Sequence, residues 1–254
     1  MIVHVALSPE TGAEYVAEAI TRQLQQKPNS ILGLATGRTM EPVYERLRYN
    51  YRTGRCSWRK ARTFNLDEYV LTGSGQHTSI FQFMQDQLIR HIDLPSEQFH
   101  IPNAHAESPR KEAEAYEALL DQHEPIDLQI LGIGTNGHIA FNEPGSAKDS
   151  RTRIVRLAEE TLTQNFGATA SRAPRHAITM GLGSIVRARK IILLATGVSK
   201  QNAITSLLQH STFTPTSPAS ALVHHPNVEL ILDPAAAAGI ARHEHRQPGS
   251  ASTI

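Results

Sequence analysis

Five short apolar runs, each bounded by residues that break regular structure, recur along the chain and limit the folds that it can adopt. They lie at residues 30–36, 61–69, 126–134, 190–196 and 228–233. Stretches with apolar residues at helical spacing lie between them, at 10–26, 78–92 and 109–123. Strands that alternate with helices form βαβ units, and a parallel sheet made of such units is covered on both faces. The pattern predicts an α/β protein with a mostly parallel sheet.

The chain has the organisation of one domain. Its 254 residues are enough to bury a sizeable core, and they contain no long linker and no internal repeat. We therefore expect a single domain over residues 1–241. The segment 242–254, "RHEHRQPGSASTI", is polar and aperiodic, and we expect it to be a mobile tail.

Composition argues against several classes of partner. The 25 Lys and Arg residues nearly balance the 24 Asp and Glu residues, so no basic surface for nucleic acid is expected. No apolar run approaches the length of about 18 residues that a membrane span needs, and the N-terminus lacks a signal-peptide pattern. The single cysteine, Cys56, cannot form an internal disulfide and fits a reducing compartment. We expect a cytoplasmic protein that binds neither nucleic acid nor a membrane.

Four polar clusters directly follow predicted strands. "TGRT" follows the run at 30–35, "LDEY" follows 61–65, "GTNGHIAFNEPG" follows 127–133, and "GVSK" follows 190–196. In open α/β sheets, ligands bind outside the carboxyl ends of the strands. The four clusters are therefore expected to lie on one rim of the sheet and to form one pocket.

The third cluster begins with G-x-G-x-x-G, the pattern of a dinucleotide-binding turn, at 132–137. That turn needs a helix that starts within the glycines and continues, so that its N–H groups meet a pyrophosphate. Pro144 and Gly145 would break such a helix, and no acidic residue ends a convincing strand about twenty positions further on. Glycines that merely permit a turn would not account for the nearby His138 and Glu143. We expect no nucleotide cofactor.

Five segments together resemble the glucosamine-6-phosphate deaminase (isomerising) family. In chain order they are "FNLDEY" (64–69), "GIGTNGHIAFNEPG" (132–145), "RTRI" (151–154), "ITMGLGSI" (178–185) and "SPASALVHHPN" (217–227). The similarity runs from about residue 30 to residue 233, and "GHIAFNEPG" is its most specific string. The wider superfamily, with 6-phosphogluconolactonases and ribose-5-phosphate isomerases, has an open Rossmann-like sheet without a nucleotide. The resemblance implies the same architecture, with helices on both faces.

The resemblance implies an aldose–ketose isomerisation that releases ammonia and gives fructose 6-phosphate. It assigns ring opening to His138, whose imidazole suits a proton shuttle because it titrates near neutrality. It assigns removal of the C2 proton to Asp67, and Glu143 is expected to orient the imidazole. Glu68 is a weaker candidate, since it can be purely structural. Neither a metal nor another cofactor is required.

Asn136 is a departure from the family pattern, because some members have aspartate before the catalytic histidine. An asparagine still forms hydrogen bonds but carries no charge. We therefore include Asn136 among the catalytic residues and expect His138 to depend more on Glu143.

The substrate phosphate is expected to bind at two loops that lead into helices. The first has Thr36, Gly37, Arg38 and Thr39, and aims backbone N–H groups at an anion. In the second, Lys200 matches the phosphate lysine of the family. Taken singly, each loop would read as an ordinary capped helix start.

The supply of positive charge to the phosphate is the second departure. The family commonly has glycine where Arg38 stands, and many members have an arginine in the segment matching 161–170, which has none here. Arg38 is expected to replace this cation. Arg172 and Arg175, in the expected lid around 160–177, are the other candidates.

Regulatory and metal sites have weaker support. Ser146 and Arg153 match parts of an activator site that some hexameric members have between subunits, but Val155 stands in place of its lysine. Control of that kind is not expected, and monomer, dimer and hexamer all stay open. Histidines at 224, 225, 243 and 245 lack a third ligand at a suitable spacing, so no metal site is expected.

Three alternatives to a glucosamine 6-phosphate deaminase remain to be separated by assay. One is the same chemistry on another hexosamine phosphate, such as galactosamine 6-phosphate. A lactonase is disfavoured by "DEY" together with "GHIAFNEP". A catalytically silent sugar-phosphate sensor would be expected to lose a catalytic residue, whereas Asp67, His138 and Glu143 are all present.

Overall fold

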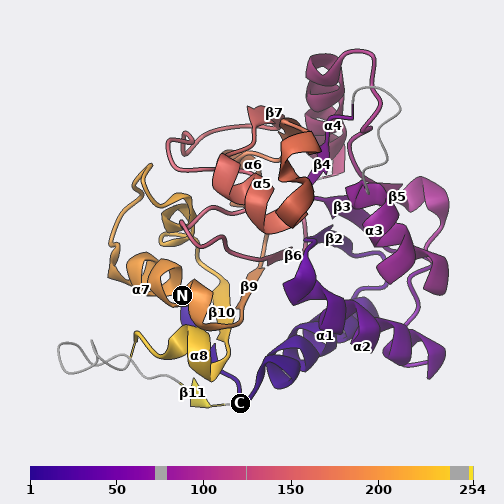
Figure 1. Ribbon diagram of the computed structural model, residues 1–254. Helices are drawn as coiled ribbons and strands as arrows, with labels where there is room; N and C mark the ends of the chain where they lie inside the picture. The colour runs from indigo at the N-terminus through magenta and orange to yellow at the C-terminus, as the bar shows by residue number, and fades with distance from the viewer. Residues whose placement is uncertain (72–78, 124, 241–251, 254) are drawn as a thin grey trace.

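An eight-stranded sheet organises the computed structural model, which describes residues 1–71, 79–123, 125–240 and 252–253 (Figure 1). The strand order is β11-β1-β10-β9-β6-β2-β3-β5, and every neighbouring pair is parallel. This confirms the predicted α/β class. The strands are β1 (Ile2–Val5), β2 (Ile31–Leu34), β3 (Arg62–Asn65), β5 (Phe99–His100), β6 (Leu128–Leu131), β9 (Ile191–Ala195), β10 (Val228–Leu232) and β11 (Ser252–Thr253).

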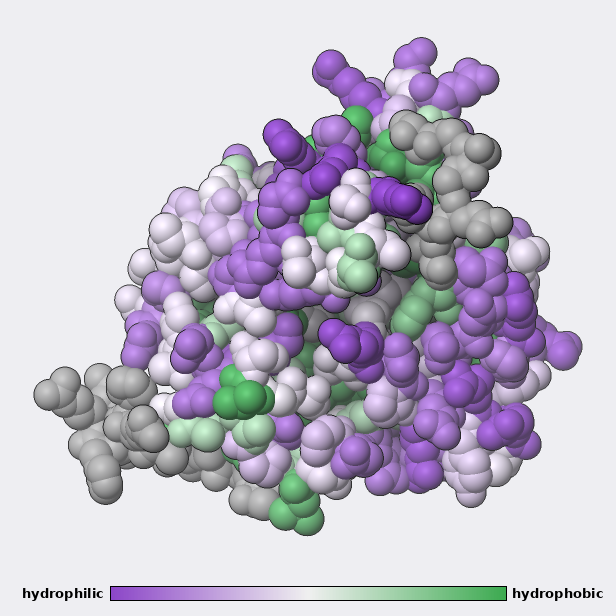
Figure 2. Space-filling view, viewed as in Figure 1, coloured by the Kyte–Doolittle hydropathy of each residue, from purple (hydrophilic) through white to green (hydrophobic). Residues whose placement is uncertain are grey.

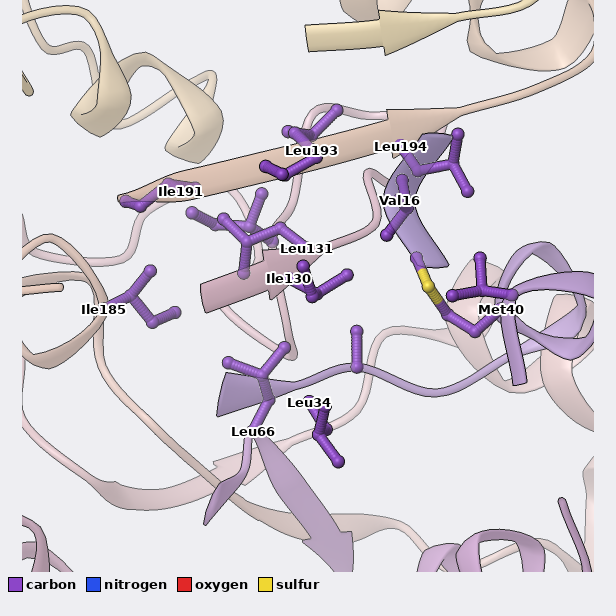
Figure 3. Close-up of a cluster of buried hydrophobic side chains, with 14 of the residues drawn as sticks. Val16, Leu34, Met40, Leu66, Ile130, Leu131, Ile185, Ile191, Leu193 and Leu194 are labelled. Carbon is purple, nitrogen blue, oxygen red and sulfur yellow. The ribbon is translucent and has the colours of Figure 1, made fainter. Parts of the chain in front are cut away.

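Helices cover both faces of this sheet, which explains why its central strands are continuous apolar runs. Helix α1 (Pro9–Gln26) begins at Ser8, whose hydroxyl accepts a hydrogen bond from the Thr11 N–H at 3.2 Å. It packs on β9 and β10, and Figure 3 shows its Val16 near Leu194. On the other face, Tyr116 of α4 (Pro109–His123) packs edge-on against Phe64 of β3.

The remaining helices flank this core. In Figure 1, α2 and α3 gather with α1 beside one end of the sheet, and α7 and α8 lie beside the other. The expected helix at 78–92 is shorter than its apolar pattern suggested, because a 3₁₀ turn at Ile89–His91 follows α3. The helices are α2 (Glu41–Arg52), α3 (Ile80–Gln87), α5 (Glu159–Phe166), α6 (Leu182–Ile185), α7 (Gln201–Gln209) and α8 (Pro234–Ala237).

A second, antiparallel sheet has the order β4-β8-β7. Its strands are β4 (Asp67–Tyr69), β8 (His176–Thr179) and β7 (Arg153–Arg156). The chain passes from the first sheet to the second at Leu66, whose N–H donates to Leu34 O at 3.2 Å and whose carbonyl accepts from Met180 N at 2.8 Å. The apolar run at 61–69 is therefore divided between two sheets, and Asp67 is the first residue beyond the junction.

The C-terminal segment expected to form a tail lies outside the described residues, except for β11, which pairs with β1. None of the helices in the described ranges is long and apolar enough to cross a membrane. On the face shown in Figure 2, apolar side chains form small, separated patches among hydrophilic ones. That face has no continuous apolar surface.

Candidate functional site

The four polar clusters lie at one edge of the sheet. Strands β3, β2, β6 and β9 are neighbours in this order, and parallel strands bring their carboxyl ends to the same edge. Strand β3 leads to Asp67, and β2 leads to the loop at 36–39. Strand β6 leads to the turn at 132–143, and β9 leads to the loop at 197–200. The structure therefore brings the residues assigned to catalysis and to phosphate binding to one rim of the sheet.

The turn after β6 is closed by hydrogen bonds among its own backbone groups. Gly134 N donates to His138 O at 2.9 Å, and Gly137 N donates to Gly134 O at 3.1 Å. A Cβ atom on Gly134 would lie 2.1 Å from Cε1 of His138, so only glycine leaves room for the imidazole ring. No helix begins within residues 132–145, so the turn does not have the form of a dinucleotide-binding turn.

Asn136, His138 and Glu143 form a hydrogen-bonded relay. The Asn136 side-chain amide donates through Nδ2 to Glu143 Oε2 at 2.8 Å, and its Oδ1 lies 2.8 Å from His138 Nδ1. A carboxylate only accepts hydrogen bonds, so the amide group must face Glu143 and Oδ1 must face the imidazole. His138 Nδ1 therefore carries a proton, which leaves Nε2 as the nitrogen available to a substrate.

The Glu143 carboxylate lies 3.5 Å from His138 Nδ1, with the two side chains 18% and 16% exposed. Burial alone would raise the pKa of Glu143. Hydrogen bonds from His138, Thr161 and Asn136, together with the charge on His138, outweigh burial and lower this pKa to about 2. Glu143 is therefore ionised at neutral pH and can stabilise an imidazolium on His138.

Asp67 has the opposite environment. Its side chain is buried, and no described residue donates a hydrogen bond to its carboxylate. Burial raises its pKa to about 8, and the neighbouring charge of Glu68 adds to this rise. Such a carboxylate is suited to accept a proton from carbon near neutral pH.

Glu68 anchors the start of α3. Its carboxylate accepts hydrogen bonds from the backbone N–H groups of Tyr69, Ile80 and Phe81 at 2.7, 2.9 and 2.7 Å. Burial raises the pKa of Glu68, and these hydrogen bonds oppose the rise. Among described residues, all the hydrogen bonds of Glu68 are with backbone groups, which fits the structural role that the sequence left open for it.

Two loops of the same form flank the relay, one on each side of β6. Both have the sequence Leu-Ala-Thr-Gly, at 34–37 and 194–197. Gly37 (φ 102°) and Gly197 (φ 89°) each precede a 3₁₀ turn that continues into a helix, α2 or α7. A left-handed φ of this kind favours glycine. The shared tetrapeptide is a local repeat that the sequence analysis missed.

The first loop has Thr36, Gly37, Arg38 and Thr39, and the second has Lys200. Burial lowers the pKa of Lys200, the charge of Arg38 lowers it further, and Glu160 opposes both. Arg38 and Lys200 are therefore close enough for their charges to interact. Two cations just before the N-terminal ends of α2 and α7 make this part of the rim suited to bind an anion.

The rival cations are placed less favourably. Arg175 forms an ion pair with Glu159 at 2.7 Å, and Arg172 lies exposed in a 3₁₀ turn after α5. Arg153 donates to Asn142 Oδ1 at 2.8 Å and to Ser146 Oγ at 3.1 Å. Arg153 and Ser146, which match parts of the activator-site pattern, are thus hydrogen-bonded to each other.

Helix α5 supplies contacts that sequence reasoning missed. Thr161 donates a hydrogen bond to Glu143, Glu160 accepts one from Thr135 at 2.6 Å, and Asn165 donates to the Tyr69 hydroxyl at 3.1 Å. The only signal in the sequence was the expectation of a lid around these residues. These contacts place α5 against the relay turn and against the strand that carries Asp67.

The histidine pairs do not form a metal site in the described part of the chain. His225 is buried and donates through Nε2 to Ala188 O at 2.7 Å, and its Nδ1 accepts from Asn227 N at 3.2 Å. Among described residues there is no group of three potential ligands. Residues 243 and 245 lie outside the described ranges.

Comparison with known proteins identifies the class. Residues 7–232 match the model of the glucosamine-6-phosphate isomerases/6-phosphogluconolactonase family. The chain is 44% identical over 221 residues to a glucosamine-6-phosphate deaminase of Lysinibacillus sphaericus, covering 86% of this chain and 93% of that protein. The chain belongs to the glucosamine-6-phosphate isomerase/6-phosphogluconolactonase family.

Solved structures agree with this placement. A monomeric glucosamine-6-phosphate deaminase has a TM-score of 0.90 and 36% identity, with 94% of this chain and 100% of that chain covered. A 6-phosphogluconolactonase from Trypanosoma cruzi has a TM-score of 0.75 and 20% identity, with 94% and 96% covered. The second likeness shows the shared fold alone.

Proposed function

We propose that this protein converts glucosamine 6-phosphate and water to fructose 6-phosphate and ammonia, as a step in amino-sugar catabolism. The observation that carries the proposal is the pair of acid–base groups on one rim, a hydrogen-bonded histidine relay and a separate buried carboxylate. Ring opening and carbon deprotonation require such groups at different atoms of one substrate. The named function of relatives at 44% and 36% identity supports the same reaction.

His138 opens the sugar ring in the proposed reaction. A proton leaves the C1 hydroxyl, the bond between C1 and the ring oxygen breaks, and the ring oxygen receives a proton. His138 Nε2 moves this proton, because Nδ1 is held as a donor to Asn136. The ionised Glu143 stabilises the imidazolium while the proton resides on the ring.

Asp67 then transfers a proton from C2 to C1 of the open aldehyde. The electron pair of the C2–H bond forms the C1=C2 double bond, the carbonyl pair moves to O1, and O1 takes a proton from the substrate ammonium, which gives an enolamine. The proton held by Asp67 then passes to C1, which leaves an iminium group at C2. Water adds to this iminium group and ammonia leaves, which gives the ketose. The groups that we assign to these steps are side chains of this chain, and the proposal includes no metal or other cofactor.

The two Leu-Ala-Thr-Gly loops are proposed to hold the phosphate, with Thr36, Gly37, Arg38 and Thr39 on one side and Lys200 on the other. A charged hydrogen bond contributes about 1.5–3 kcal/mol, so Arg38→Ala is expected to raise KM by about tenfold or more and to change kcat less. Arg172→Ala is the comparison variant. An unchanged KM in Arg38→Ala with a raised KM in Arg172→Ala would transfer the role to Arg172.

One assay tests the function as a whole. Purified protein is incubated with glucosamine 6-phosphate, and ammonia and fructose 6-phosphate are measured. Formation of both products is expected. Product from galactosamine 6-phosphate alone would favour the epimeric substrate, binding without turnover would favour a sensor, and hydrolysis of 6-phosphogluconolactone instead would favour a lactonase.

We also propose that the enzyme acts in the cytoplasm, since its substrate is a phosphorylated intermediate and its single cysteine needs no oxidising compartment. A homo-oligomer is among the assemblies that the sequence allows, although one solved relative is monomeric. Light scattering on the purified chain distinguishes monomer, dimer and hexamer.

A further inference from the structure

Helix α5 is fixed to the site by polar contacts at both of its ends. Near its start, Glu160 accepts a hydrogen bond from Thr135 in the relay turn at 2.6 Å. At its end, Asn165 donates to the hydroxyl of Tyr69 at 3.1 Å. Between these contacts, Thr161 donates to Oε1 of Glu143. Thr161 is only 2% exposed, so its hydroxyl has little access to water.

The hydrogen bonds of Glu143 are divided between its two oxygens. Oε2 accepts from Asn136 Nδ2 at 2.8 Å and faces His138 Nδ1 at 3.5 Å. Oε1 has Thr161 as its donor. The Asn136 contact holds only one oxygen, so the Thr161 hydroxyl is what fixes the rotation of the carboxylate toward the imidazole. A buried acceptor without its donor is destabilised.

We propose that Thr161 is a positioning residue that holds Glu143 against His138, and that it thereby makes the ring-opening relay depend on α5 being docked over the turn. This inference rests on the proposed function for its kinetic consequence. Thr161 reaches the reaction only through Glu143. Hydrogen bonding from Thr161 is also one cause of the lowered pKa of Glu143, which agrees with a role in keeping that carboxylate ionised.

Thr161→Val removes the hydroxyl with little change in side-chain volume. Loss of a hydrogen bond to a charged group is expected to lower kcat by about tenfold or more, with KM changed less because Glu143 acts in ring opening. The NMR resonance of the His138 Nδ1–H proton is expected to move upfield, because the Glu143 carboxylate that faces it is less firmly held. Thr161→Ser keeps the hydroxyl and should restore both quantities. Thr163→Val, at an exposed position that bonds only within α5, is the matched control and should behave as wild type.

The experiment combines steady-state kinetics with NMR spectra of labelled histidines in the full chain. The His138 resonance is assigned by its absence in His138→Gln. We expect Thr161→Val to be slower and its His138 Nδ1–H resonance to move upfield. We also expect rescue by serine, and little further loss when Thr161→Val is added to Glu143→Gln. A wild-type His138 resonance in Thr161→Val, or equal loss in Thr161→Ser, would overturn the proposal.

Failure of the proposed function would look different. A wild-type protein that forms no ammonia from glucosamine 6-phosphate would refute the reaction, yet the His138 Nδ1–H resonance would still report whether Thr161 positions Glu143. Conversely, an active wild type with an unaltered Thr161→Val would refute the positioning role alone. Melting temperatures of the three variants show whether any loss comes from unfolding.

Discussion

Asp67 and Glu143 are carboxylates on the same rim whose pKa values shift in opposite directions. Burial raises the pKa of Asp67 to about 8, and the charge of Glu68 adds to the rise. Burial acts on Glu143 in the same sense, yet hydrogen bonds and the charge of His138 lower its pKa to about 2. The difference lies in the donors, since Glu143 has several and no described residue donates to the Asp67 carboxylate.

The same chemical group, a carboxylate, thus takes two roles in one site. A carboxylate surrounded by donors stays ionised and serves as a fixed counter-charge. A carboxylate desolvated without donors binds a proton more strongly and serves as a base. Separated pKa values of this kind are a common way to assign acid and base roles.

Asp67→Asn is expected to have the largest effect. It removes the base while keeping the size of the side chain, so kcat should fall by about 10³-fold, within the range of general-base contributions. Exchange of the C2 proton with solvent, followed by NMR, should stop. Binding of the substrate phosphate should persist, which a binding titration measures as the control. Continued exchange would show that another group is the base.

Glu143→Gln should lower kcat by about 100-fold, because it removes the counter-charge of the imidazolium but leaves the base intact. Substrate deuterated at C2 distinguishes the two sides of the site. A slowed ring opening masks the isotope effect, so the effect should be smaller in Glu143→Gln than in wild type. An isotope effect that grew instead would assign Glu143 to the proton-transfer step at C2.

The pH dependence follows from the raised pKa of Asp67. Only the ionised carboxylate is a base, so kcat/KM should fall by about tenfold per pH unit on the acid side of pH 8. The same shift affects stability. A carboxyl group with a raised pKa favours the folded state most below its unfolded pKa, and this contribution is lost as pH rises through about 8.

Asp67→Asn is the control for this pH dependence. Since it removes the buried charge, its melting temperature should exceed that of wild type above pH 8, and the excess should shrink as pH falls toward 4. Calorimetry measures the excess. A constant difference across this range would show that the Asp67 carboxyl has an ordinary pKa in the folded state.

The sequence predicts the strands and the residues of the rim, but not the different surroundings of Asp67 and Glu143. The central strands were predictable, because burial on both faces makes them continuous apolar runs, and the residues of the rim follow from the ends of those strands. The division of 61–69 between two sheets was not predictable, since pairing with β8 is a tertiary contact. The donors to Glu143 were missed for the same reason: Thr161 is 18 residues away. The pKa of Asp67 depends on packing that has no local pattern.

Asn136→Asp should have the smallest effect on kcat. It makes the surroundings of Glu143 more like those of Asp67. The substitution removes the amide donor to Glu143 and places a second carboxylate beside it, as Glu68 lies beside Asp67. Two neighbouring carboxylates cannot both stay ionised at low cost, so the pKa of Glu143 should rise. The added charge also stabilises an imidazolium on His138.

These two consequences oppose each other in catalysis, so kcat at neutral pH should change only a few-fold. Asn136→Ala is the control, because it removes the donor and the acceptor together without adding charge. It should lower kcat, since the imidazole loses the acceptor that fixes its tautomer. If Asn136→Asp were as damaging as Asn136→Ala, the amide donation to Glu143, rather than the tautomer of His138, would be what the relay requires.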